Sequence, residues 1–363
     1  MKNTVILTMM IILAAGMNAC KTKPRAEEKF NWVVDRFDDI KVLRYQVPGF
    51  DTLSLEEKKL IYYLNQAALC GRDIFFDQNG RYNLRIRRTL EAIEQGYTGD
   101  RTSEDFGKFE KYLKKVWFAN GIHHHYSLDK FLPEFSESYF DELVAGYFPQ
   151  DFTPSVAAVV TEIKPVMFDP ELFPKRTNQA AGEDMIATSA NNYYEGVTQK
   201  EVEAYYGKLI DHRDSTPISY GLNSKLVKED GKLVEKVWKV DGMYSSAIEK
   251  IVYWLEQASG VAKGAQKRTI DELIGYYRSG DLSQFDTYSI SWVQDTLSKV
   301  DFVNGFIEDY GDPLGRKASW EANVNFMDTE ACHRTEVISD NAQWFEDHSP
   351  VAEAYRKPGV RGV

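Results

Sequence analysis

A carboxylate and a phenol lie two positions apart near the end of the chain, in the run FIEDYGDP (306–313). In an extended segment, residues i and i+2 point to the same side. Glu308 and Tyr310 would therefore project together, just before the turn signal at 311–313. A carboxylate there can hold a cation, and a phenol can donate a hydrogen bond to a polarised carbonyl. Spacing alone more commonly indicates a strand end with a surface glutamate and a half-buried tyrosine.

A run of three histidines, His123 to His125, is the sequence feature that most invites a metal. Adjacent side chains diverge on a helix and on a strand, so the three rings cannot easily bind one ion. On a strand, His123 and His125 would share a face, but no carboxylate lies nearby. Because a zinc site needs three or four ligands, the run predicts no metal site.

The first twenty residues predict a cleaved signal peptide. Lys2 supplies positive charge, and the apolar run at 5–15 is too short to span a bilayer. Cys20 directly follows Ala19, as in a bacterial lipoprotein cleavage site, which predicts a lipid anchor at Cys20 and a polar tether over 21–29. We therefore expect a periplasmic or outer-envelope protein that contacts the membrane only through this anchor.

Composition limits the class of protein. A chain of 363 residues suits one large or two ordinary domains, and 43% hydrophobic with 27% charged residues is typical of a soluble globular protein. The net charge of −11 argues against binding nucleic acid. Cys70 and Cys332 lie far apart with nothing local to support a disulfide, so we expect two unpaired thiols.

Local patterns predict a mixed α+β chain. Ser54 with Glu57 and Thr198 with Glu201 are capping boxes that begin helices to about 70 and 210. Gly71 is a candidate for ending the first of them. A strand is expected at 41–47, and a hairpin around Asp230-Gly231 joins 222–227 to 233–240. Periodicity predicts further helices at 83–95, 103–119, 135–147, 243–259 and 270–279. Prolines between 148 and 182 predict that no long element forms there.

Two polar groups are expected to serve structure rather than ligand binding. Asp312 and Arg316 fit a turn cap or an ion pair. The cluster Asn191-Asn-Tyr-Tyr194 suits a loop beside a cleft. Such residues more commonly form turns or pack against neighbouring segments.

Three stretches carry a resemblance to a known family: FIEDYGDPLGRKASWE (306–321), the region 30–78 and KYLKKVWFANGIHHHYSLDKF (111–131). They resemble the dipeptidyl peptidase III family, zinc exopeptidases that remove dipeptides from peptide N-termini, and most of all its members from Bacteroides-type bacteria. The likeness runs from about residue 30 to 363 and covers only the N-terminal half of such an enzyme. It implies a substrate-binding lobe over 30–325, mostly helical and wrapped around a small β-barrel. Residues 326–363 would begin the crossing to a second, zinc-carrying helical lobe across a cleft.

The resemblance also implies roles for particular residues. Glu308 matches the glutamate that binds the free α-ammonium of the substrate, and Tyr310 matches the catalytic tyrosine that donates to the scissile carbonyl. His125 and Tyr126 match a stretch that lines the cleft near the first substrate residues. The family holds Zn²⁺ with a His-Glu-x-x-Gly-His element, but this chain has no His-Glu dipeptide. We therefore expect the zinc ligands in a C-terminal lobe outside this chain, and no activity from these 363 residues alone.

The predicted function is that of a zinc-dependent dipeptidyl peptidase acting on oligopeptides, represented by its N-terminal part. The alternative is a non-catalytic, lipid-anchored envelope protein that binds peptides or glycans with its aromatic surface. Signal peptide, acidity and the 13% aromatic content fit both. A chain that truly ends at Val363 would favour the alternative. Dipeptide preference and oligomeric state are not indicated by the sequence.

Overall fold

The computed structural model describes residues 30–149 and 155–361, so the expected signal peptide, Cys20 and the tether lie outside the described residues. The chain divides into two compact units between Val47 and Pro48. In the first unit, β1 (Val33–Phe37) and β2 (Ile40–Leu43) form an antiparallel hairpin, with Asp38 in the left-handed region at the turn. The strand expected at 41–47 therefore ends at Leu43, and its partner β1 was not predicted.

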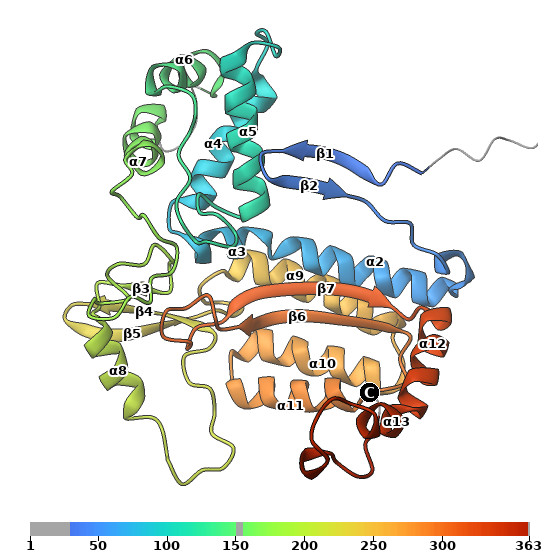
Figure 1. Ribbon diagram of the computed structural model, residues 1–363. Helices are drawn as coiled ribbons and strands as arrows, with labels where there is room; N and C mark the ends of the chain where they lie inside the picture. Colours follow the sequence, from blue (N-terminus) through green and yellow to red (C-terminus); the bar gives the residue numbers. More distant parts are fainter. Residues whose placement is uncertain (1–29, 150–154, 362–363) are drawn as a thin grey trace, which may run out of the picture. The chain divides into compact units, whose positions relative to one another are not determined.

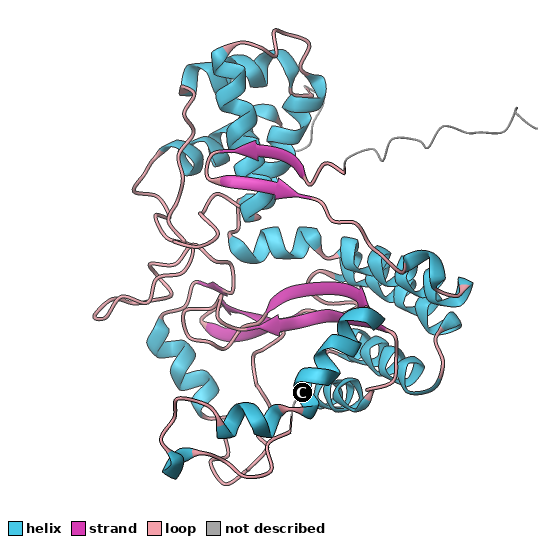
Figure 2. Ribbon diagram, turned by 45° about the vertical axis from the view of Figure 1, so that its right-hand side comes forward, coloured by secondary structure: helices cyan, strands magenta, loops and turns pink. Residues whose placement is uncertain are grey.

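The second unit contains all the other described elements. They follow in the order η1 (Phe50–Thr52), α2 (Leu55–Cys70), α3 (Arg72–Asn79), α4 (Asn83–Gly96), α5 (Glu104–Ala119), α6 (Glu137–Tyr147), α7 (Val156–Phe168), β3 (Tyr194–Glu195), α8 (Gln199–Gly207), β4 (Ser224–Glu229), β5 (Lys232–Val237), α9 (Ser245–Val261), α10 (Gly264–Ser279), α11 (Leu282–Gln294), β6 (Val300–Glu308), β7 (Ser319–Phe326), α12 (Thr329–Asp340), α13 (Ala342–Asp347) and η2 (Glu353–Tyr355). Helices predominate over narrow strand ribbons (Figure 2), which confirms the α+β class.

The described strands do not close into a barrel, so that expectation was wrong. They form separate sheets, β1–β2, β3–β4–β5 and β6–β7. At the start of β7 a side chain of α3 occupies the place of a further strand. Gln78 donates to the carbonyl of Ala318 at 3.1 Å and accepts the N–H of Trp320 at 2.8 Å. These backbone groups are thereby satisfied without another strand.

One hydrophobic core surrounds the long β6–β7 ribbon. Figure 1 shows the ribbon passing between α2 and the pair α10–α11. Trp320 is buried in this core, and its indole N–H donates to the hydroxyl of Tyr277, which donates to Asn304 at 2.6 Å. The apolar face of β7 and the helices around it thus hold the strand that leads away from the Tyr310 turn.

A second core contains no strand residue. It joins α4, α5, α6 and α7, coloured cyan to green in Figure 1, with Phe76 of α3 and loop residues such as Ile122 and Phe135. Contrary to our expectation for 148–182, α7 runs through Pro165. Pro165 has no N–H to donate to the carbonyl of Thr161, and the helix continues for only three residues after it. Burial of Val159, Ile163 and Met167 outweighs that loss.

Most local signals are confirmed. Both capping boxes are present, at Ser54 and Thr198. Asp230 and Gly231 adopt positive φ in the two-residue turn between Glu229 and Lys232, as expected for this hairpin. The two cysteines expected to stay unpaired, Cys70 and Cys332, are free thiols. Within residues 30–149 and 155–361, no helix has both the length and the apolarity needed to cross a bilayer.

Gly71 ends α2, but not as a left-handed cap. Its φ is −86°, and α3 begins at the next residue. A Cβ atom at this position would lie 2.2 Å from the Trp320 ring. Glycine is required here because α2 approaches the buried indole closely, which the sequence around residue 71 does not indicate.

Candidate functional site

The predicted site residue Tyr310 lies in the turn that connects β6 to β7. The strand ends at Glu308, two residues earlier than the extended segment assumed for Glu308 and Tyr310, and Glu308 pairs with Ser319 of β7. The Ser319 hydroxyl donates to the Glu308 carbonyl at 3.0 Å. The register shifts between Phe306 and Glu308, so the end of the strand does not have the regular alternation that the spacing argument assumed. Tyr310 is 72% exposed and available to a ligand.

Two carboxyl groups and the phenol lie close together at this end of the ribbon. Burial raises the pKa of Glu321, and so do the charge of Glu308 and a hydrogen bond with it. The pKa of the Tyr310 phenol is raised by burial and then by the charges of Glu308 and Glu321. The phenol therefore stays protonated near neutral pH and can donate a hydrogen bond. The paired carboxyl groups form a negative site suited to a cation.

A largely buried guanidinium from a different segment acts electrostatically on the Tyr310 phenol. Arg176 lies in the long loop between α7 and β3, and burial lowers its pKa, while the charges of Tyr193 and Tyr310 raise it. Its Nε is buried without a hydrogen-bond partner among the described residues. The backbone of Arg176 is fixed on both sides, because its N–H donates to Leu128 and its carbonyl accepts from Asn191. A fixed, incompletely paired cation beside a phenol can attract developing negative charge.

Asp312 holds the turn in shape. It is fully buried, and its carboxylate accepts the Tyr194 hydroxyl at 2.7 Å and the backbone N–H groups of Leu314, Arg316 and Lys317. This confirms the turn cap expected for Asp312, whereas Arg316 contributes its backbone N–H. The turn preceding β7 is therefore built around a buried carboxylate.

The loop before β3 ties down the same turn from outside. Asn191 and Thr177 both donate side-chain hydrogen bonds to the carbonyl of Gly311, at 3.0 and 2.9 Å. The expected packing role of the Asn-Asn-Tyr-Tyr cluster is thus confirmed, since Asn191 and Tyr194 both fasten the 311–312 turn. Residues far apart in sequence fix the position of Tyr310.

A fully buried lysine follows the turn. Lys317 donates to the Tyr206 hydroxyl and, at 3.0 Å, to Ser224. Burial lowers its pKa to about 7, although the charge of Glu235, 3.9 Å away, acts in the opposite direction. Because Tyr206 and Ser224 both donate to Glu235, at 2.6 and 2.7 Å, the polar groups in this interior are mutually satisfied.

His123 is separated from the other two histidines, whereas the rings of His124 and His125 pack together with their centroids 4.4 Å apart. His123 is buried, and its Nε2 is 2.8 Å from the Phe173 carbonyl, whereas Nδ1 of His124 accepts the N–H groups of Tyr126 and Ser127. His125 packs edge-on against Phe118 and Tyr126, and Tyr126 is 86% exposed. This segment is joined to the loop before β3, because the backbone N–H of Arg176 donates to the carbonyl of Leu128 at 2.9 Å.

The described residues do not fit a zinc ion. Within 30–149 and 155–361, no three His, Cys, Asp or Glu side chains gather as a metal site would require. The Tyr310 turn itself offers a phenol that can donate a hydrogen bond and neighbouring charged groups.

Sequence reasoning assigned no role to Glu321 or Arg176. Glu321 had a usable signal, because Trp320, Ala322 and Val324 alternate with it and direct it to the opposite face of β7. Arg176 had none, since it belongs to an irregular loop far from Tyr310 in sequence.

Comparisons with known proteins agree on one family. The family model of peptidase family M49 matches residues 182–361. Dipeptidyl peptidase 3 of Homo sapiens is 22% identical over 346 residues, which is 85% of this chain and 47% of the human protein. Dipeptidyl peptidase 3 of Nematostella vectensis is 22% identical over 289 residues, covering 70% of this chain and 39% of that protein.

Solved structures show the same fold. Dipeptidyl peptidase III from Caldithrix abyssi matches with a TM-score of 0.56 and 17% identity, over 85% of this chain and 47% of that one. The Corallococcus sp. strain EGB enzyme matches with a TM-score of 0.53 and 19% identity, over 86% and 46%. The chain thus spans less than half the length of these relatives. On the family model, the sequence relatives and the shared fold together, this chain belongs to the dipeptidyl peptidase III family, peptidase family M49.

Proposed function

We propose that this chain carries the peptide-binding part of a zinc-dependent dipeptidyl peptidase that acts on the free N-terminus of oligopeptides. The observation that carries the proposal is the group at the end of β6–β7, where Tyr310 is 72% exposed two residues after Glu308 and the charges of Glu308, Glu321 and Arg176 act on the pKa of its phenol. Its two carboxyl groups, protonated phenol and guanidinium offer complementary partners to the ammonium and the carbonyl groups of a peptide end.

Glu308, with Glu321 beside it, would hold the α-ammonium of the substrate. A blocked N-terminus would leave these carboxylates without a cation, which disfavours acylated peptides. Tyr310 would donate to the scissile carbonyl as negative charge develops on its oxygen, and Arg176 would add positive potential there. His125 and Tyr126 are proposed to contact the first substrate residues from the neighbouring loop.

Zinc would supply an activated water molecule in the complete enzyme. Its ligands are proposed to lie outside this chain, because the described residues do not gather a metal site. Exposed apolar side chains on α12 and α13, Val337, Ile338, Trp344 and Phe345, are compatible with a further lobe packing there. On this proposal the 363-residue chain binds peptides and does not hydrolyse them.

Calorimetric titration of the chain with tetra-alanine and with N-acetyl-tetra-alanine tests the proposal. We expect the free-amine peptide to bind about tenfold or more tightly, since a charge-assisted hydrogen bond is lost on acetylation. With added Zn²⁺, mass spectrometry should find both peptides intact. Equal affinities for the two peptides would contradict an ammonium-binding site. Hydrolysis of either peptide would contradict the proposal that the zinc ligands lie outside this chain. Binding of oligosaccharides in place of either peptide would support the non-catalytic envelope protein.

We also propose the location indicated by the N-terminal residues, an outer-envelope or periplasmic protein anchored through a lipidated Cys20. A chain beginning at Cys20 with the added mass of acyl groups is the expected result of intact-mass analysis on membrane fractions. A mature chain that keeps residues 1–19, or that begins elsewhere, would contradict the anchor.

A further inference from the structure

A cavity of about 320 Å³ lies between the two hydrophobic cores. Ile122 and Val166 of the α4–α7 core line it, and so do Tyr194 and Val197 of the core around β6–β7. Its volume falls at the lower end of the roughly 300–1,000 Å³ typical of small-molecule sites. The cavity is therefore large enough to receive an amino-acid side chain.

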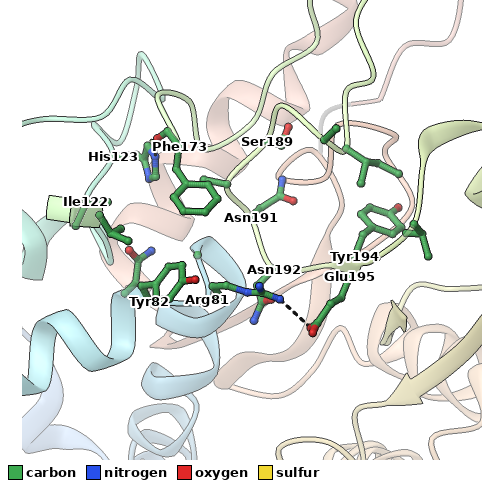
Figure 3. Close-up of a pocket in the computed structure, with 18 of the residues that line it drawn as sticks. Arg81, Tyr82, Ile122, His123, Phe173, Ser189, Asn191, Asn192, Tyr194 and Glu195 are labelled. Carbon is green, nitrogen blue, oxygen red and sulfur yellow. Dashed lines mark hydrogen bonds and ion pairs between the residues drawn. The ribbon is translucent and has the colours of Figure 1, made fainter. Parts of the chain in front are cut away.

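Two aromatic rings form one wall of this cavity. Tyr82 and Phe173 both line it, with their ring centroids 5.8 Å apart, and both residues are half-buried. Figure 3 shows these two rings on one side of the space and Tyr194 on the other. Half-buried rings keep apolar surface that a ligand can cover, and a further aromatic group packs on such rings at centroid distances of roughly 4.5–7 Å.

The backbone of Phe173 is strained. Its φ of 54° lies in the left-handed region, which bulky residues rarely adopt. Neighbouring segments hold it there: Nε2 of His123 lies 2.8 Å from the carbonyl of Phe173, and the N–H of Lys130 donates to the carbonyl of Pro174 at 2.9 Å. Strain of this kind gathers at ligand-binding sites, where the surrounding structure fixes a residue in an otherwise unfavourable conformation.

The charges at the cavity neutralise one another. Among the described residues that line it, Arg81 and Glu195 are the two with a full charge, and they form an ion pair at 3.0 Å. Glu195 also accepts a hydrogen bond from Lys225 at 2.5 Å. Because the carboxylate of Glu195 already pairs with two cations, the cavity favours an uncharged, apolar group over a charged one.

The wall of the cavity is fastened to the Tyr310 turn. Asn191 lines the cavity and donates to the carbonyl of Gly311 at 3.0 Å, and the Tyr194 hydroxyl donates to Asp312 at 2.7 Å. Because Gly311 directly follows Tyr310, Nδ2 of Asn191 lies within about 10 Å of the Tyr310 Cα atom. An extended tetrapeptide spans about 13 Å, so a peptide bound at the turn can reach the cavity with one of its side chains.

We propose that this cavity is a specificity pocket that receives a large apolar side chain, above all an aromatic one, from the peptide bound at the Tyr310 turn. The proposal rests on the peptide binding proposed above and adds the class of side chain that the peptide carries. Phenylalanine suits the pocket because it presents an uncharged ring to Tyr82 and Phe173 and needs no hydrogen-bond partner.

Calorimetric titration with a set of phenylalanine-containing tetrapeptides tests the proposal. Each of four peptides replaces one alanine of tetra-alanine by phenylalanine. We expect one of them to bind about tenfold or more tightly than tetra-alanine, because its ring leaves water for the cavity. The other three should bind nearly as tetra-alanine does, since their rings stay in solvent.

Phe173→Gly should remove this gain in affinity and leave the binding of tetra-alanine unchanged. Glycine adopts a positive φ without strain, so the variant loses the aromatic wall but keeps the backbone conformation of the loop. Leu128→Gly is the matched control, because Leu128 also has a positive φ, of 63°, and does not line the cavity. This control should keep the phenylalanine gain.

A second variant, Ala187→Trp, tests the pocket without removing a wall. Ala187 is exposed and lines the cavity, so an indole at this position should occupy the space and abolish the gain. Ala181→Trp, at an exposed position of the same loop outside the cavity, should keep it. Circular dichroism and thermal unfolding establish that each variant is folded, and Ala187→Trp decides the test if Phe173→Gly is not.

No gain at any of the four positions, or a gain that survives the loss or the filling of the pocket, would overturn the proposal. Titration of tetra-alanine and its acetylated form alongside separates this inference from the proposed function. If the free-amine preference is present while the phenylalanine gain is absent, only the pocket fails. A phenylalanine gain shared by acetylated peptides, without a free-amine preference, would contradict the ammonium site and support the pocket.

Discussion

Replacing Glu308 by glutamine is expected to remove most of the preference for peptides with a free amino terminus. Glutamine keeps the shape of the side chain but replaces a charged acceptor, so tetra-alanine should bind about tenfold to a hundredfold more weakly. N-acetyl-tetra-alanine should be nearly unaffected, because it presents no ammonium to this position. Calorimetric titration gives the dissociation constants of both peptides for both proteins. The ratio of the acetylated to the free-amine constant is then compared between the unmodified chain and Glu308→Gln.

The control for this experiment is Glu142→Gln. Glu142 is an exposed carboxylate on α6, a helix whose buried face belongs to the other hydrophobic core. It should leave both affinities unchanged. The pH dependence provides a second check. Since the pKa of Glu321 is raised by burial and by Glu308, this carboxyl takes up a proton as the pH falls through that raised value, and the free-amine peptide should then bind more weakly. Equal losses for the free and acetylated peptides, or the same loss in Glu142→Gln, would contradict an ammonium site.

Replacing Asp312 by alanine should cost about 4 kcal/mol of unfolding free energy, because it leaves several buried donors without an acceptor. The groups affected are the Tyr194 hydroxyl and the backbone N–H groups of Leu314, Arg316 and Lys317. Urea unfolding followed by tryptophan fluorescence measures the loss.

Tyr194→Phe is the matched comparison, since it removes one donor and leaves the other hydrogen bonds of Asp312 in place. It should cost only about 1 kcal/mol. If the two variants were equally stable, the carboxylate would not organise the 309–317 turn. Glu308, Tyr310 and Glu321, which are proposed to bind peptides, would then need another explanation for their position.

Structural features that depend on only a few neighbouring residues were predicted correctly from the sequence. The capping boxes at Ser54 and Thr198 and the Asp230-Gly231 turn depend on hydrogen bonds and φ preferences within the same segment. A strand followed by a turn was expected at this place, but β6 ends at Glu308, so Tyr310 lies in the turn and not in the extended segment. Pro165 was misjudged because the burial of α7 side chains in the helical core decides whether a proline in the last turn is tolerated.

The sequence by itself determined the α+β class, most helices, and the run that carries Glu308 and Tyr310. Only the tertiary structure showed that the described strands form separate sheets and that Gln78 from α3 pairs with the backbone at the start of β7. It also brought Arg176 and Glu321 to Tyr310 and packed Gly71 against Trp320. Local rules act through neighbouring residues, whereas these contacts join segments that chain folding alone brings together, and single-sequence patterns carry no record of them.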